Sequence, residues 1–177
     1  PMFHTPPRLD GHEMPPGTYP TETGIDPLLE VLIENSEALK EWVGDAWFRI
    51  TGRASVYGAG SSLTWHRDDH EFYSGAFIYY AHPEWNIRWG GELLIAEPDG
   101  LDDLPVMPFR FENSEYNERL NELGVGHYVF PKPNRLVVLG DLPHCVTPVT
   151  PAAGRSIRAS LAGFFVLREQ LSDSDES

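Results

Sequence analysis

The chain has 177 residues, of which 41% are hydrophobic and 23% are charged, and its formal net charge at pH 7 is −14. This length and composition predict one globular domain over residues 1–177 with a sizeable buried core. The acidic balance argues against nucleic acid and anionic membrane surfaces as partners, because both require clustered lysine and arginine. No apolar run reaches the ~20 residues that a membrane-spanning helix needs.

The single cysteine, Cys145, excludes a disulfide framework within the chain and is compatible with a reducing compartment, so we expect a cytoplasmic protein. Its position beside His144 leaves two interpretations open. One is a thiol exposed to oxidation, and the other, which we favour, is a small buried hydrophobic side chain.

Residues 1–24 are rich in proline and glycine, which predicts an irregular arm. A helix is then expected to begin at Asp26, which suits an N-cap, with Pro27 at the first helical position. Apolar residues recur at helical spacing as far as Trp42, and Gly44 is a plausible stop. We expect this helix to pack against the outside of a sheet.

Short β-like segments separated by breakers follow from Ala46 onward and predict a mainly β sandwich or jelly roll. An acidic insertion at 98–126 interrupts them and contains a predicted helix at 114–123, which is either a substrate lid or a plain surface excursion. The polar tail 168–177 is predicted to be disordered. The expected strands lie at residues 47–57, 61–66, 74–81, 92–96, 127–130, 135–140, 146–149 and 156–167.

Two histidines and an aspartate carry the strongest chemical signal in the chain. His66 and Asp68 are separated by one residue, and His144 lies far downstream. Residues i and i+2 of a strand point to the same face, so His66 and Asp68 can reach one ion while His144 completes the site from a neighbouring strand. Two imidazoles and one carboxylate, with open positions left, are a ligand set of non-heme Fe(II). We therefore predict that these three residues bind iron and form the catalytic centre.

Asp69 and His70 offer competing ligands, because the local sequence is His-Arg-Asp-Asp-His. His66 and His70 would share a helix face, as in zinc peptidases, but no glutamate follows His66 and the surrounding pattern is β. We therefore prefer Asp68 as the carboxylate ligand. Asp69 is interpreted as orienting a neighbour and His70 as facing the substrate.

Further motifs accompany the metal ligands in a defined order. They are Tyr57-Gly-Ala-Gly60-Ser-Ser-Leu63, Ile78-Tyr-Tyr80, Trp89-Gly-Gly-Glu-Leu93, Pro133-Asn-Arg-Leu-Val-Val-Leu139 and Arg158-Ala-Ser-Leu-Ala-Gly-Phe-Phe165. With them, residues 47–167 resemble the prolyl-4-hydroxylase-like family of Fe(II)/2-oxoglutarate-dependent oxygenases. The resemblance implies a double-stranded β-helix, a jelly roll of the cupin type, with Fe(II), 2-oxoglutarate as cosubstrate and ascorbate as reductant.

The resemblance also implies the reaction. Relatives consume O₂ and convert 2-oxoglutarate to succinate and CO₂ while they hydroxylate a substrate carbon. In the wider superfamily, glycine or alanine in place of the acid ligand is associated with halogenation, so Asp68 implies hydroxylation.

The distal carboxylate of 2-oxoglutarate needs a fixed cation, and the planar fork of arginine binds a carboxylate through two hydrogen bonds. Arg155 and Arg158 both follow His144. The family pattern Arg-x-Ser/Ala-Leu/Ile-x-x-Trp/Phe matches at Arg158, which we therefore predict as the anchor. Its separation from His144 is a few residues longer than is usual in the family.

Two tyrosines are further candidates for contact with the cosubstrate. Tyr57 resembles the family tyrosine that bonds 2-oxoglutarate or lines its cavity, and plain core packing is an equal alternative. Tyr79 and Tyr80 are adjacent in a predicted strand, so one points inward and the other outward. Tyr79 is predicted to contact the cosubstrate.

The substrate is the feature that the sequence determines least. Relatives hydroxylate prolyl residues in proteins, free amino acids and small natural-product scaffolds. Because no peptide-binding domain is recognisable, we predict a small molecule, with a protein or peptide prolyl hydroxylase as the alternative. The negative net charge mildly favours a neutral, zwitterionic or cationic substrate. A non-catalytic jelly-roll metal sensor and a cupin-type zinc hydrolase are the alternatives from other classes.

Overall fold

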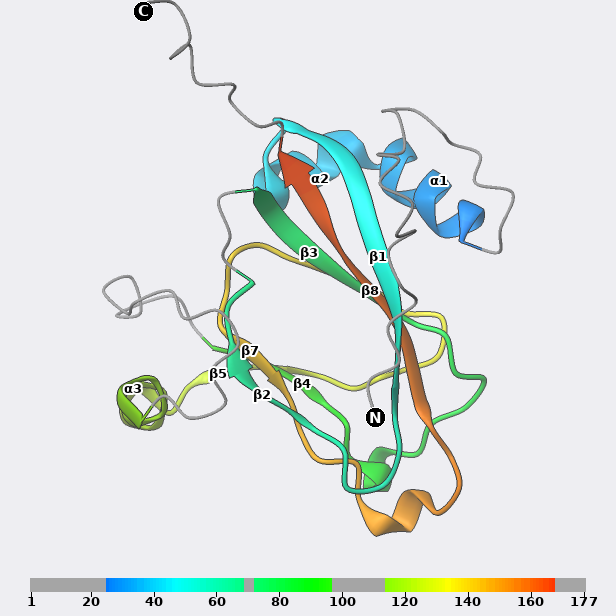
Figure 1. Cartoon of the computed structure of the whole chain (residues 1–177), viewed down its shortest axis with the longest axis vertical. Helices are drawn as coiled ribbons and strands as arrows, with labels where there is room; N and C mark the ends of the chain where they lie inside the picture. Colours follow the sequence, from blue (N-terminus) through cyan, green and yellow to red (C-terminus); the bar gives the residue numbers. More distant parts are fainter. Residues whose placement is uncertain (1–24, 69–71, 97–113, 168–177) are drawn as a thin grey trace, which may run out of the picture.

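Eight strands form two four-stranded antiparallel sheets in the computed structural model, which describes residues 25–68, 72–96 and 114–167 (Figure 1). The predicted arm, the part of the insertion at 98–113 and the acidic tail lie outside the described residues. The first sheet contains, in order, β1 (Trp47–Tyr57), β8 (Arg158–Leu167), β3 (Tyr73–Tyr80) and β6 (Leu136–Leu139). The second contains β2 (Leu63–His66), β7 (His144–Val146), β4 (Leu93–Ala96) and β5 (Gly126–Val129).

The inner faces of the two sheets share one hydrophobic core. Tyr80 of β3 and Leu93 of β4 are both fully buried in it, and Val146 of β7 packs in the same cluster. Sequence neighbours such as β1 and β2 lie in different sheets, while β1 pairs with β8 at the other end of the chain. This is the double-stranded β-helix that the sequence predicted.

One predicted strand is displaced. The strand expected at 146–149 instead begins at His144 and ends at Val146 as β7. Pro148 has no backbone N–H to donate to a ladder, and beyond it only an isolated bridge forms, between Val149 and Gly90. The strand predicted at 47–57 matches β1 at both ends, and the other predicted strands differ from the observed ones by at most two residues at either end.

The single helix predicted after residue 25 is two helices, α1 (Asp26–Glu34) and α2 (Ser36–Val43). The break falls at Asn35, whose side-chain Nδ2 donates to the carbonyl of Val31 at 2.7 Å. Asparagine side chains compete in this way with the backbone bonds of a helix. Asp26 is the first helical residue rather than the N-cap, which is Ile25, and Gly44 ends α2 with a φ of 66° as expected.

Both helices cover the outer face of the first sheet, as Figure 1 shows. Leu32 of α1 and Val43 of α2 are buried against Phe77 and Phe165 of the sheet. The close approach depends on Gly75 in β3, where an added Cβ would lie 2.5 Å from Val43 Cγ1 and 2.7 Å from the carbonyl oxygen of Leu139.

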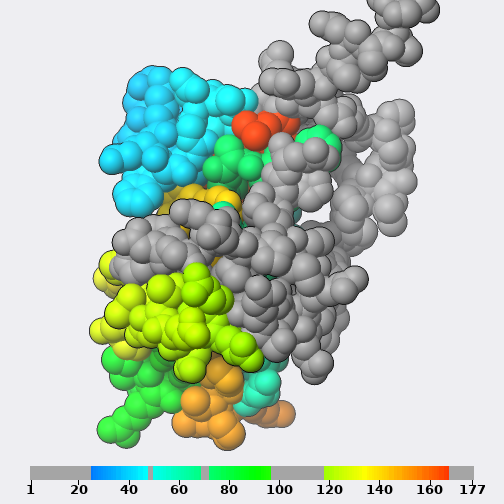
Figure 2. Space-filling model, turned by 90° about the vertical axis from the view of Figure 1, so that its left-hand side faces the viewer, coloured from blue at the N-terminus to red at the C-terminus, as the bar shows by residue number. Residues whose placement is uncertain are grey.

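The remaining helical elements lie with the second sheet. They are α3 (Ser114–Leu123) and the 3₁₀ turns η1 (Ile87–Trp89) and η2 (Pro151–Ala153). In Figure 2, α1 and α2 (blue) form one end of the molecule, and the segment with η2 (orange) lies at the other. No helix among the described residues is long and apolar enough to cross a membrane.

The helix predicted at 114–123 is present, although β5 already begins at Gly126, inside the predicted insertion. Leu120 and Leu123 of α3 pack in a small cluster with Trp65 and Ala96, from β2 and β4. The helix is therefore anchored beside the strand that carries His66.

We predict that Gly75→Ala lowers the stability of the protein by about 1–3 kcal/mol, because the new methyl group overlaps a backbone carbonyl as well as Val43. The matched control is Gly58→Ala, where an added Cβ meets no atom within 4 Å. Urea denaturation compares the two variants. Equal midpoints for both would show that the helix does not need this close approach.

Candidate metal centre and anion pocket

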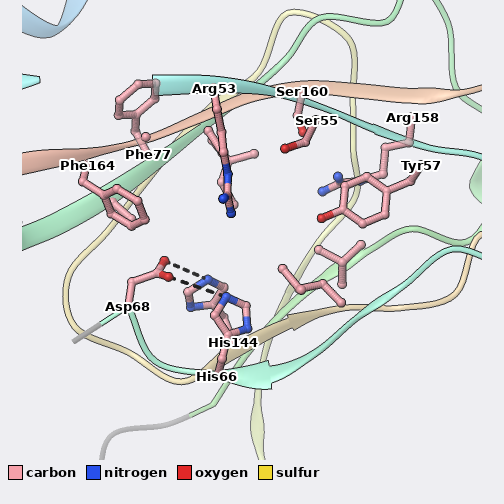
Figure 3. Close-up of a pocket in the computed structure, with 16 residues that line it drawn as sticks. Arg53, Ser55, Tyr57, His66, Asp68, Phe77, His144, Arg158, Ser160 and Phe164 are labelled. Carbon is pink, nitrogen blue, oxygen red and sulfur yellow. Dashed lines mark ion pairs between the residues drawn. The ribbon is translucent and has the colours of Figure 1, made fainter. Parts of the chain in front are cut away.

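The structure brings the three predicted metal ligands together. His66 ends β2 and His144 begins β7, and the two residues are direct cross-strand partners with ring centroids 4.3 Å apart. Asp68 follows His66 by two residues, with one carboxylate oxygen 3.7 Å from His66 Nε2 and the other 3.4 Å from His144 Nε2 (Figure 3). One ligand atom from each residue lies within 4.8 Å of the other two, so one metal ion can contact all three.

Backbone carbonyl groups fix the orientation of both imidazole rings. His66 Nδ1 lies 2.8 Å from the carbonyl oxygen of Thr64, and His144 Nδ1 lies 2.8 Å from that of Leu142. A carbonyl oxygen can only accept, so the neutral rings carry hydrogen on Nδ1 and direct the lone pair of Nε2 at Asp68. Two nitrogen lone pairs and a carboxylate facing one another suit a cation, and the carbonyl partners are the outer contacts that metal-binding histidines usually have.

The electrostatics favour the metal-binding protonation states. Burial lowers the pKa of His66, and the neighbouring His144 lowers it further, against a smaller raising effect of Asp68. For Asp68, burial is the largest effect and raises the pKa, but the hydrogen bond and charge interaction with His144, and the charge interactions with His66 and Arg53, outweigh it, so the net pKa is below the ordinary value. A metal ion bound between these residues would also favour the charged carboxylate.

An ion pair ties the two ligand-bearing segments together. Arg67, the residue after His66, donates from Nε and from Nη2 to the carboxylate of Asp141, three residues before His144. The bidentate geometry fixes both position and orientation. It therefore holds the end of β2 beside the start of β7.

The competing ligands Asp69 and His70 lie outside the described residues. Cys145 is 7% exposed, and burial raises the pKa of its thiol to about 11. This is the behaviour of a small buried hydrophobic side chain rather than of a reactive thiol.

Arg158, in contrast to Arg155, lies in the interior. Its side chain is 1% exposed at the start of β8, whereas Arg155 is exposed on the preceding loop. Its Nε donates to the carbonyl of Gly91 at 2.9 Å, and Nη2 lies 3.5 Å from the Tyr80 hydroxyl. The guanidinium carbon is 5.0 Å from the ring centre of Tyr57 and 4.9 Å from that of Tyr80. Within the described residues, no acidic side chain pairs with it.

The Gly90–Gly91 pair explains how Arg158 reaches this position. Both glycines have positive φ, of 71° and 75°, in the turn that precedes β4. A Cβ on Gly91 would lie 2.9 Å from Arg158 Cδ. The glycine therefore supplies a turn, an acceptor for Nε and the room for the arginine side chain.

The tyrosines divide between the two faces of the first sheet. Tyr57 is buried beside Arg158, its direct cross-strand partner, as expected for a residue of this pocket. Tyr79 is not brought into the pocket, because it points to the other face, where its hydroxyl donates to Asn134 Oδ1 at 2.8 Å. Its neighbour Tyr80 takes that place. Burial raises the pKa of both Tyr57 and Tyr80, against the opposing charge of Arg158, so both remain neutral hydroxyl donors.

A cavity with about 540 Å³ of empty space, part of it open to solvent, connects Arg158 with the three metal-ligand candidates. Ser55 of β1 and Ser160 of β8 are buried cross-strand partners on its wall, and neither hydroxyl makes a hydrogen bond with a described residue. Arg53 and Phe164 also line it, and Figure 3 shows both directed into it. Arg53 and Ser55 were not predicted from the sequence, although strict alternation back from Tyr57 places both on the same face of β1.

Comparisons with known proteins agree with this arrangement. Residues 52–166 match a family model described as the 2OG-Fe(II) oxygenase superfamily. A prolyl-4-hydroxylase from Pseudomonas putida is similar over 84% of this chain and 70% of its own, with 21% identity and a TM-score of 0.61. No curated protein matches the chain.

Two further solved structures share the fold. A Trichoplax adhaerens prolyl hydroxylase, in complex with a peptide fragment of the hypoxia inducible factor oxygen degradation domain, is 15% identical over 82% of this chain and 59% of its own, with a TM-score of 0.56. A prolyl 4-hydroxylase from Phytophthora capsici is 16% identical over 83% of this chain and 43% of its own, with a TM-score of 0.52. Because the family match spans well over half of the sequence and includes all three candidate ligands and Arg158, the chain belongs to the 2OG-Fe(II) oxygenase superfamily and is a 2-oxoglutarate-dependent non-heme iron dioxygenase.

Proposed function

We propose that this enzyme hydroxylates an unactivated carbon of a small molecule, such as an amino acid or a natural-product intermediate, with release of succinate and CO₂. In this proposal His66, Asp68 and His144 hold Fe(II), Arg158 anchors 2-oxoglutarate, and ascorbate serves as reductant. Bound Fe(II) supplies the redox chemistry with O₂ and the keto acid. The protein supplies binding, orientation and exclusion of water.

The observation that carries the proposal is the buried charge of Arg158. Removing an ion from water costs several kcal/mol unless a counter-charge compensates. Arg158 is 1% exposed, and no acid pairs with it in the described part of the chain. A dicarboxylate whose other end binds the metal would supply the missing negative charge. A metal sensor without a cosubstrate, or a zinc hydrolase, would have no use for this arginine.

The pocket also indicates how the distal carboxylate would be held. Nε of Arg158 donates to Gly91, and Nη2 donates one hydrogen to the Tyr80 hydroxyl at 3.5 Å. The remaining N–H groups of Nη1 and Nη2 are left to form the fork that a carboxylate accepts. The neutral hydroxyls of Tyr57 and Tyr80 lie beside the guanidinium and can donate to the same carboxylate. Ser55 and Ser160 would line the path from there to the metal.

A second candidate function is the hydroxylation of prolyl residues in a protein or peptide. It is favoured by the fold, since the similar structures are prolyl hydroxylases and one is in complex with a peptide. The two candidates share the proposed metal and cosubstrate sites and differ only in the substrate. A screen of succinate release against free amino acids, small metabolites and proline-rich peptides compares them. Stimulation by peptides alone would overturn the small-molecule proposal.

We predict that His66→Ala or Asp68→Ala weakens Mn(II) binding by at least about 100-fold and abolishes Fe(II)-dependent conversion of 2-oxoglutarate to succinate, because a direct ligand is lost. Cys145→Ala is the matched control, since Cys145 is next to His144 but remains a protonated thiol. Titration calorimetry measures Mn(II) affinity. Full Mn(II) affinity in the Asp68 variant would exclude this carboxylate as a ligand.

We predict that Arg158→Met weakens 2-oxoglutarate binding by about 10- to 100-fold, because a charge-assisted bidentate contact is lost. Arg155→Met, which removes an exposed arginine of the same segment, should bind 2-oxoglutarate as the wild type does. The readout is the rise in melting temperature when 2-oxoglutarate is added to the Mn(II)-loaded protein without O₂. The opposite pattern in the two variants would reassign the anchor to Arg155.

A further inference from the structure

A second arginine points into the same cavity and is used by neither the metal nor the cosubstrate in the proposed arrangement. Arg53 is partly buried on the inner face of β1, and its side chain extends toward the two imidazoles in Figure 3. It makes no hydrogen bond or ion pair with any residue in the described ranges, although it is close enough to Asp68 to lower the pKa of that carboxyl. Its fork of donors is therefore available to a ligand.

The strand register places Arg53 and Arg158 at opposite ends of the cavity. Tyr57 pairs with Arg158 across β1 and β8, whereas Arg53 pairs with Ala162. The four residues from Tyr57 to Arg53 correspond to about 13 Å of extended strand. In Figure 3, His66 and His144 lie below Arg53, and Asp68 lies below Phe164. A 2-oxoglutarate that extends from these ligands to Arg158 would therefore leave the space beside Arg53 and Phe164 for a substrate.

The balance of formal charge identifies what Arg53 lacks. The two positive charges of Fe(II) would be matched by Asp68 and by the carboxylate of 2-oxoglutarate that binds the metal, and the distal carboxylate would match Arg158. The charge of Arg53 would remain uncompensated within the described cavity, close to a dication that repels it. One further anionic group beside the metal would remove that penalty.

We propose that Arg53 binds a carboxylate of the substrate and thereby makes this enzyme selective for small carboxylic acids, free amino acids in particular. This inference rests on the proposed function. The planar guanidinium matches a carboxylate through two parallel hydrogen bonds. A zwitterionic amino acid suits both the local charge of Arg53 and the net charge of the protein. Its carboxylate would pair with Arg53, and its ammonium group would offset the repulsion between that carboxylate and a chain of net charge −14.

The test uses pairs of probes that differ only at the carboxyl group: free L-amino acids and small carboxylic acids, each with its primary amide. Binding to enzyme loaded with Mn(II) and 2-oxoglutarate is measured by calorimetry without O₂, and stimulation of succinate release is measured separately with Fe(II). In the wild type, the best acids should bind about 10- to 100-fold more tightly than their amides. Arg53→Gln should bind acid and amide alike, and Arg53→Lys should restore part of the preference.

Two controls test whether the preference for acids depends on Arg53, and whether Arg53 acts on the substrate rather than on 2-oxoglutarate. Arg155→Gln removes the same charge from an exposed site and should leave the preference for acids unchanged. The affinity of Arg53→Gln for 2-oxoglutarate alone should stay within about twofold of the wild type, whereas a loss comparable to that of Arg158→Met would assign Arg53 to the cosubstrate and overturn the proposal.

The remaining outcomes are also decisive. If the wild type binds 2-oxoglutarate but no acid binds better than its amide, or if Arg53→Gln keeps the preference, the role of Arg53 is refuted while the proposed function stands. If the wild type does not bind 2-oxoglutarate at all, the proposed function and the role of Arg53 are both refuted.

Discussion

An arginine side chain held almost completely out of water is the constraint around which this structure is organised. The guanidinium of Arg158 is surrounded by two tyrosine rings and a glycine carbonyl, all contributed by strands or turns distant from it in sequence. Each neighbour contributes differently, because the rings offer their negative faces to a cation and the glycine leaves room for the side chain. Without an anion, an interior built in this way retains an uncompensated charge.

The two sheets divide the chemistry between them. The second sheet carries the histidine pair on neighbouring strands, and the first carries every arginine and tyrosine that is proposed to bind a ligand. All these side chains come from regular strands or lie within two residues of a strand end, so their separations are fixed by backbone hydrogen bonding. The ion pair between Arg67 and Asp141 further fixes the end of β2 beside the start of β7. A site of this kind has little need for rearrangement when its ligands arrive.

Most of this arrangement follows from local pattern. The one-residue spacing of His66 and Asp68 works because strand side chains alternate, and the breaker residues between short apolar runs predicted nearly every strand. The failures have equally local causes. Asn35 divides a helix because its amide competes for a backbone carbonyl, which apolar periodicity does not reveal. Tyr79 and Tyr80 are chemically equivalent neighbours, so only the pairing of β3 with β8 decides which one faces Arg158. Alternation back from Tyr57 could have placed Arg53 on the pocket face of β1, but its separation from Arg158 depends on the register between β1 and β8, which the sequence alone does not supply.

The burial of Cys145 bears on how long the enzyme survives its own chemistry. Burial raises the pKa of this thiol to about 11, so it is protonated at pH 7, and the thiolate is the form that peroxides attack. If His144 binds iron as proposed, unproductive turnover would release such oxidants next to this residue. Protonation of this sulfur would therefore spare the catalyst from oxidative damage at a position next to a proposed ligand.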